Sequence, residues 1–257
     1  MCHTTHSIVT RRIFLLVINL LAFQVAFSQA GLTELTVDRP GIAESPFTVP
    51  RGTYQIEVGF DYFKRSTGEL YNLPVALFRT GINKRSELRV SSRHVLDRTE
   101  VNTLRSVSPL SIGVKMHVIK QDQWIPEADI MANLVIPLNP ASSQAKNLGY
   151  EVLLLFQNDF YPNTAINYNV GYIWDSNHAK SVFTASFCFN YLPTERVGLF
   201  AEYFGYIPNQ WPGEQGLDGG ITYLLLPTLQ LDISAGISRL ELRNNVFVSS
   251  GFSFRIN

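Results

Sequence analysis

The sequence predicts an all-β fold: a transmembrane antiparallel up-and-down β-barrel of about 12 strands, preceded by a signal peptide and an irregular N-terminal segment. Three observations favour it. Apolar and polar residues alternate along most of the chain, short and longer connections alternate between these segments, and no later window approaches the ~18 apolar residues of a spanning helix. A sheet crosses hydrocarbon only when it closes on itself, so these observations together indicate a barrel.

Composition limits the classes of partner. The chain carries 21 Lys and Arg against 21 Asp and Glu, and charged residues make up only 16% of it. Ordinary soluble domains contain roughly 25% charged residues, so part of this surface is expected to face lipid or to be unusually well hidden. The zero net charge and the lack of charge blocks give no reason to expect a nucleic-acid partner.

The N-terminus has the pattern of a secretory signal peptide, which we expect to span residues 1–28. Arg11 and Arg12 precede an apolar run at 13–27, and the small-x-small site at 26–28 would leave Gln29 first. The two arginines also resemble a twin-arginine signal, which stays an alternative. Cleavage would remove Cys2 and leave Cys188 alone, so no intrachain disulfide is expected.

Residues 29–52 are predicted to be an irregular lead-in segment before the barrel domain at 53–257. The stretch 30–51 holds three prolines and two glycines and shows no sustained period. We expect this lead-in segment to lie in or under the barrel mouth.

The alternation is clearest at residues 53–63, TYQIEVGFDYF, where every second side chain is apolar. Successive strand side chains point to opposite faces, so such a segment has one face for lipid and one for water. Residues 149–160 fit less well, because Leu153 and Leu155 share the parity of Glu151. The strands are expected near 54–63, 74–82, 86–94, 109–120, 124–136, 149–160, 165–175, 181–191, 196–206, 217–226, 228–237 and 246–256.

Connection lengths provide a separate signal, because outer-membrane barrels have short turns at one rim and longer loops at the other. Short turns are expected at 83–85, 121–123, 161–164, 192–195 and 227. The other connections are mostly longer and are expected at 64–73, 95–108, 137–148, 176–180, 207–216 and 238–245.

Closure decides which parity faces which medium: the apolar parity faces lipid, and the polar parity faces a lumen with interspersed acids and bases. The expected lumen residues are Glu57, Asp61, Arg89, Arg93, Lys115, His117, Glu127, Asp129, Asn133, Glu202, Asp232 and Arg255. Aromatic residues near strand ends are expected to form interfacial girdles: Tyr54, Tyr62, Trp174, Tyr191, Tyr203, Tyr223 and Phe254.

Two groups of motifs resemble those of a known protein family. The first group is Asp38-Arg39-Pro40, the run from Glu44 to Pro50, Gly52, and Gln55-x-Glu57. The second is Ala201-Glu202-Tyr203, Asp218-Gly219-Gly220-Ile221-Thr222-Tyr223, and Gln230-Leu231-Asp232. Together these motifs resemble the outer-membrane transporters named for the meta-cleavage pathway of phenol degradation. The resemblance implies an outer-membrane barrel that passes small molecules, hydrophobic or aromatic ones among them, and it implies no catalytic residue.

Candidate sites have more than one reading. Glu202 is either a lumen contact for cargo or ions, or a structural partner of Arg89, Arg93 or Lys115. Asp38 and Arg39 either plug the lumen, bind a periplasmic partner or hold a local turn. His117 lacks a second histidine at ligand spacing, so we expect no metal and no cofactor.

The sequence leaves more than one class of function open, and a purely structural outer-membrane barrel is one alternative. A passive channel is favoured, with outer-membrane lipid, the barrel-assembly machinery and a small solute as partners. A lipid-modifying enzyme is disfavoured, because His94, His117 and His178 form no compact arrangement with serine on the lipid-facing parity. A soluble secreted carrier would bury the apolar parity in a closed core, and lipocalin-like carriers have about eight strands.

Overall fold

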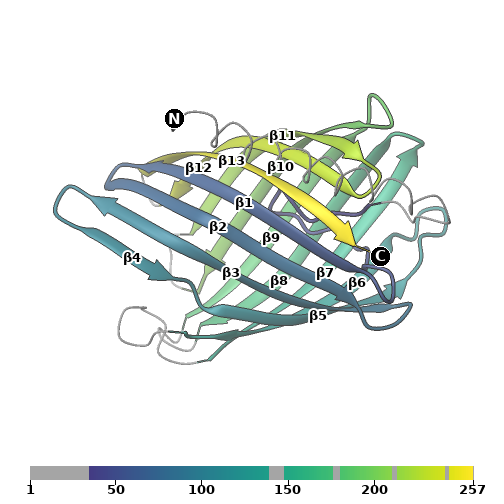
Figure 1. Ribbon diagram of the computed structural model, residues 1–257, viewed down its shortest axis with the longest axis horizontal. Helices are drawn as coiled ribbons and strands as arrows, with labels where there is room; N and C mark the ends of the chain where they lie inside the picture. The colour runs from purple at the N-terminus through teal and green to yellow at the C-terminus, as the bar shows by residue number, and fades with distance from the viewer. Residues whose placement is uncertain (1–34, 139–147, 176–179, 210–212, 241–242, 257) are drawn as a thin grey trace, which may run out of the picture. The chain divides into compact units, whose positions relative to one another are not determined.

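The computed structural model describes residues 35–138, 148–175, 180–209, 213–240 and 243–256, all within the compact unit Leu35–Asn257. The expected signal peptide, residues 29–34 of the expected lead-in segment, and His178 lie outside the described residues. The described residues contain strands and irregular segments (Figure 1). No helix long and apolar enough to cross a membrane is found among them.

Twelve strands form a closed antiparallel ring, which confirms the predicted fold class. Consecutive strands pair with each other from β5 to β13, β13 pairs with β1, and β2 and β3 complete the ring from β1 to β5. The strands are β1 Tyr54–Arg65, β2 Gly68–Gly81, β3 Ser86–Thr99, β4 Thr103–Val107, β5 Leu110–Ile119, β6 Glu127–Ile136, β7 Gly149–Tyr161, β8 Thr164–Asp175, β9 Lys180–Tyr191, β10 Val197–Pro208, β11 Glu214–Leu226, β12 Leu229–Leu240 and β13 Arg243–Ile256.

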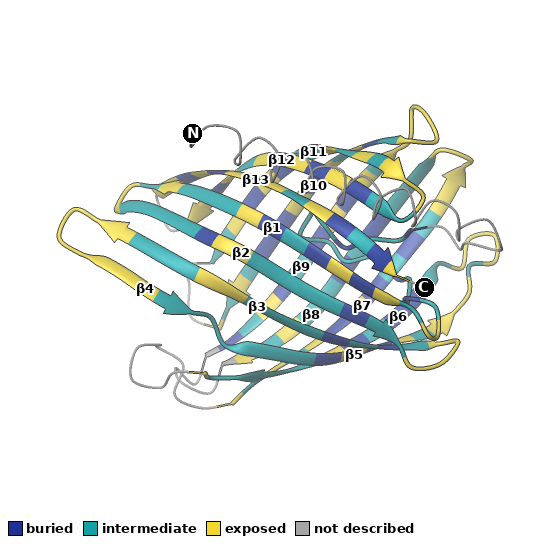
Figure 2. Ribbon diagram, in the orientation of Figure 1, coloured by how far each residue is buried: buried dark blue, intermediate teal, exposed yellow. Residues whose placement is uncertain are grey.

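The two faces of the wall follow the predicted parity. On β1, Ile56 and Phe60 are 38% and 44% exposed, whereas Gln55 and Glu57 are fully buried. Figure 2 shows buried and exposed residues alternating along the strands. The apolar parity therefore faces outward around a polar interior, as a membrane barrel requires, and the reverse arrangement of a soluble carrier is not found.

An extra strand corrects the expected loop at 95–108. β3 continues to Thr99, and its far half pairs with β4, which pairs with no other strand among the described residues. The hairpin projects from one end of the barrel (Figure 1). The apolar/polar alternation that marks the membrane-spanning part fades there, because both faces of a projecting hairpin meet polar surroundings.

The expected long connection at 64–73 is also wrong. β1 continues to Arg65 and β2 begins at Gly68, so only two residues turn the chain. The hydroxyls of Tyr62 and Tyr71 both donate to Glu69, which ties the two extended strands together. Short connections therefore occur at both rims, and loop length separates the rims less clearly than predicted.

The irregular alternation in β7 has a packing cause. Leu153 and Leu155 point inward and form a small buried cluster with Met131 of β6, which lies directly opposite Leu153. Apolar contacts inside the lumen replace ion pairs at this part of the wall. The polar parity is therefore interrupted without a change in strand register.

Candidate functional site

The lead-in segment, described from Leu35 to Gly52, lies inside the ring of strands. Leu35 and Val49 are buried. Side chains from eight strands, β1, β2, β3, β5, β8, β10, β12 and β13, hold the segment from around the lumen. It therefore crosses the interior and fills part of the cross-section of the lumen.

Carboxylates on the wall accept hydrogen bonds from the backbone amides of the lead-in segment. Glu57 accepts from the amides of Asp38 and Arg39, each at 3.2 Å. Glu202, across the lumen on β10, accepts from the amides of Ile42, at 2.7 Å, and of Ala43. Buried amides without regular structure need such partners, so these carboxylates stabilise an irregular backbone inside the barrel.

A third wall carboxylate holds the C-terminal end of the lead-in segment. Glu87 of β3 accepts from the Val49 amide at 2.6 Å and also receives the Arg79 guanidinium. Arg79 in turn donates to the Phe47 carbonyl at 2.9 Å. Backbone and ion-pair contacts therefore share the same buried side chains.

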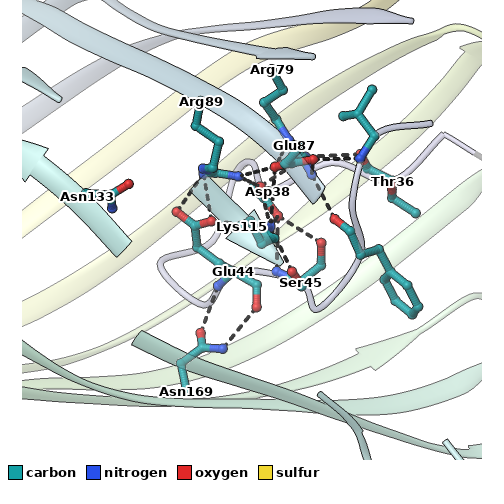
Figure 3. Close-up of polar contacts among 12 residues, drawn as sticks. Thr36, Asp38, Glu44, Ser45, Arg79, Glu87, Arg89, Lys115, Asn133 and Asn169 are labelled. Atoms are coloured by element: carbon teal, nitrogen blue, oxygen red, sulfur yellow. Dashed lines mark hydrogen bonds and ion pairs between the residues drawn. The ribbon is translucent and has the colours of Figure 1, made fainter. Parts of the chain in front are cut away.

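Asp38 lies at the centre of the ion-pair network (Figure 3). Its carboxylate is 2.6 Å from Arg89, 3.0 Å from Arg79 and 3.1 Å from Lys115. Burial opposes its ionisation, but the three cations outweigh burial and hold the Asp38 pKa well below its usual range. A buried charge of this kind is tolerated only because it is paired and hydrogen-bonded.

Glu44 is held on two sides. Its backbone N–H donates to Asn169 at 2.8 Å, and its carbonyl accepts from the same amide side chain at 3.0 Å. Its carboxylate contacts Arg89 at 2.7 Å. Burial raises the pKa of Glu44 to about 7, although Arg89 acts in the opposite direction.

Arg39 lies against the seam where β1 meets β13. Its guanidinium donates to Asp232 at 3.1 Å and to Ser249 at 2.8 Å. Gly59 and Gly251 face each other across the seam, and a Cβ atom added to Gly59 would overlap the guanidinium. The two glycines therefore leave the space that this side chain occupies.

The other expected lumen residues are placed as follows. Asp61 accepts from Ser249, and Arg255 donates to Gln55 at 3.0 Å. His117 lies 2.9 Å from Asp129 and 3.5 Å from Glu127. No group of side chains suited to a metal ion occurs within the described ranges.

Sequence reasoning missed several interior residues, above all Arg79 and Glu87. Both are fully buried, and Arg79 pairs in register with Gln55 on β1 and Arg89 on β3. Glu87 has the parity of Arg89, which was a usable signal. Arg79 was hidden because Val75 and Leu77, its neighbours on the inner parity, are apolar, so β2 shows no alternation.

An open cavity adjoins the seated lead-in segment. It has a volume of about 390 Å³ and reaches from Glu44 to the walls formed by β2, β3, β5, β6 and β7. Arg93, another expected lumen residue, lines it, and so does Asn133, whose amide donates to Glu151 at 2.6 Å. Its lining residues are Glu44, Val75, Leu77, Arg89, Ser91, Ser92, Arg93, Ser108, Pro109, Ser111, Asn133, Val135 and Glu151.

A closed twelve-strand ring with an apolar exterior and a polar lumen defines the chain as a barrel of the outer-membrane class. A family model described as "Putative MetA-pathway of phenol degradation" matches residues 37–256. The chain belongs to this family, which confirms the resemblance seen in its sequence motifs.

Solved structures share this fold at low sequence identity. The COG4313 outer membrane channel from Pseudomonas putida F1 is similar with a TM-score of 0.64 and 11% identity, over 84% of this chain and 99% of that chain. The NanC porin has a TM-score of 0.56 and 11% identity, over 77% and 98%. The KdgM porin has a TM-score of 0.52 and 9% identity, over 78% and 99%. A search of curated protein sequences gives no match.

Proposed function

We propose that this protein is a channel of the bacterial outer membrane through which small molecules, hydrophobic or aromatic ones among them, pass by diffusion. The observation that carries the proposal is the 390 Å³ open cavity beside the lead-in segment, inside a ring whose outer face is apolar. Membership of the family and the shared fold with channels and porins support it.

The proposal includes export and assembly. Residues 1–28 act as a cleavable signal peptide, residues 29–52 form the lead-in segment, and residues 53–257 form the barrel domain. Outer-membrane lipid surrounds the exposed apolar parity, and the barrel-assembly machinery inserts the chain. The outward Phe252 and Ile256 of β13 give the C-terminal strand the apolar face that insertion needs.

Within this channel, the lead-in segment acts as a constriction, and the cavity beside it provides the passage. Selection follows from the size of that space and from the mixed charges of its walls. Glu57, Glu87 and Glu202 contribute by holding the constriction in place, whereas Arg93 and Glu151 line the path itself. No catalytic role is assigned to any of these residues.

Planar-bilayer recording of the purified full-length protein tests the proposal. We expect discrete conductance steps, and liposomes that contain the protein should admit small aromatic solutes faster than protein-free liposomes. The substitution Arg39→Gln removes the Arg39 contacts and should increase both the conductance and the rate of solute entry. A folded, inserted barrel that gives no conductance and no solute entry would favour a purely structural role, and phospholipid hydrolysis would favour a lipid-modifying enzyme.

A further inference from the structure

The cavity contains a cation that the interior does not neutralise. Arg79, Arg89 and Lys115 each lie within 4.0 Å of two or more carboxylates. Arg93 is exposed and forms no ion pair within the described part of the chain. Only its backbone is engaged there: its amide donates to the Ser108 hydroxyl, and its carbonyl accepts from the Ser108 amide. Its guanidinium is therefore available to a molecule in the cavity.

Hydroxyl groups surround the same wall. Ser91 of β3 lies opposite Ser111 of β5, and both line the cavity beside Arg93. Ser92 and Ser108 also line it, but their hydroxyls are engaged within the wall: Ser92 Oγ donates to the Ser108 carbonyl at 3.3 Å, and Ser108 Oγ accepts from the Arg93 amide at 2.9 Å. The hydroxyls that face a ligand are therefore those of Ser91 and Ser111. Serine hydroxyls both donate and accept hydrogen bonds, so this wall favours a polar, anionic group.

The cavity lining also contains a carboxylate on the β7 wall. Glu151 on β7 is oriented by Asn133, which donates to one of its two oxygens. Glu151 and Arg93 line the same cavity but do not come within 4.0 Å of each other, since no ion pair joins them. No donor of the described residues hydrogen-bonds the second oxygen of Glu151, which can therefore accept a hydrogen bond from a ligand hydroxyl.

Apolar side chains complete the lining. Val75 and Leu77 come from β2 and Val135 from β6, with Pro109 beside them. A volume of about 390 Å³ is within the range of small-molecule sites, which combine an apolar lining with a few placed polar groups.

We propose that this cavity binds a small hydroxy-carboxylate with an apolar body. Arg93 pairs with the carboxylate in the two-pronged geometry that guanidinium groups favour. Glu151 accepts the hydrogen bond of the distal hydroxyl, and Val75 and Leu77 cover the apolar body. Glu44, when ionised, repels a carboxylate from the lead-in side and so keeps the anion near Arg93. This assignment rests on the proposed channel function and names the class of solute that the channel favours.

Calorimetric titration of the full-length protein in detergent tests the assignment with three probes: 4-hydroxybenzoate, benzoate and phenol. We expect 4-hydroxybenzoate to bind most tightly. Arg93→Gln should weaken both carboxylates by about tenfold and leave phenol unchanged, because a lost charge-assisted contact is of this order. Glu151→Gln should reduce the preference for 4-hydroxybenzoate over benzoate. Arg105→Gln, an exposed arginine on β4 outside the cavity, is the matched control.

The two proposals fail in different ways. Equal affinity of wild-type protein and Arg93→Gln for all three probes would overturn the ligand assignment, even if the protein conducts. Arg93-dependent binding by a protein that forms no conductance steps would overturn the channel and leave the binding site. Heat-modifiable migration on gels establishes that each variant is folded before it is titrated.

Discussion

The carboxylate of Asp38 in the lead-in segment lies 2.6 Å from the guanidinium of Arg89 on the barrel wall. Arg79 and Lys115 meet the same carboxylate, and none of these four side chains is more than 8% exposed. This contact joins an irregular segment to three strands whose cations Arg79, Arg89 and Lys115 outnumber the wall carboxylates Glu57 and Glu87 that pair with them. The seating of the lead-in segment therefore depends on it.

The substitution Asp38→Asn should release the lead-in segment. Removing one partner from a buried ionic network costs about 3–5 kcal/mol, because the remaining charges lose their compensation. Hydrogen exchange of residues 38–49 should become faster while exchange in the strands stays slow. Asp122→Asn, in the turn before β6, is the control for loss of one carboxylate. Unchanged protection of the segment in Asp38→Asn would contradict the central place of this residue.

The substitution Gly59→Ala should displace Arg39 without removing any charge. The added Cβ would overlap the guanidinium, which then loses Asp232 and Ser249. Single-channel conductance should rise, because the lead-in segment is no longer held at the β1–β13 seam. Gly205→Ala adds the same methyl group to β10, where the nearest atom would be 3.6 Å away, and should leave conductance unchanged.

The substitution Glu202→Ala tests the opposite side of the lumen. It removes the acceptor of the Ile42 and Ala43 amides, at a cost of about 1–3 kcal/mol per unsatisfied buried group. Conductance or solute uptake should change, and heat-modifiable folding should persist, because the barrel ring itself is intact. Glu202→Gln keeps one acceptor oxygen and should have a smaller effect. Unchanged permeation with lost folding would instead make Glu202 essential to the barrel.

The lead-in segment should be seated more firmly in acid than in mild alkali. The pKa of Glu44 is raised from 4.5 to about 7 when the segment is seated, so the seated state binds a proton that the released state does not. This stabilisation is complete below the released-state pKa and is lost as the pH rises through about 7. Asp38 stays ionised throughout this window, because its pKa lies well below its usual range.

Conductance measured between about pH 5 and about pH 8 checks this pH dependence. Open-channel current should increase with pH in the wild-type protein, because deprotonation of Glu44 destabilises the lead-in segment in its place inside the lumen. Glu44→Gln, which does not titrate, should flatten the profile. An identical pH profile in the variant would assign the dependence to another group.

The sequence was sufficient to predict the ring because the membrane restricts the choices. A spanning sheet must close, and closure assigns the two parities of a strand such as β1 to lipid and lumen. The rule weakens where lipid ends, so the pairing of β3 with β4 and the short β1–β2 turn were missed. It also weakens where the interior is apolar, as at Leu153 and Leu155, which pack on Met131.

A place for the lead-in segment in or under the barrel mouth was expected, but the contacts that hold it there were not predictable from sequence patterns. Its hydrogen bonds join residues far apart in the chain: Ile42 and Glu202 are separated by 160 positions. Glu202 accepts hydrogen bonds from backbone amides, which every residue carries, so no complementary side chain in the sequence indicates its partner. From the sequence it was therefore paired with the bases Arg89, Arg93 and Lys115. It contacts none of them within the described hydrogen bonds and ion pairs.

The Arg39 contacts also set an order of assembly. Asp232 belongs to β12 and Ser249 to β13, so this side chain has no binding place until the last two strands have been added. Gly59, on the first strand, completes the place only once that strand has met the last. The Arg39 side chain can thus take its place only after the first strand has met the last, and it then fastens from inside the junction that shuts the cylinder.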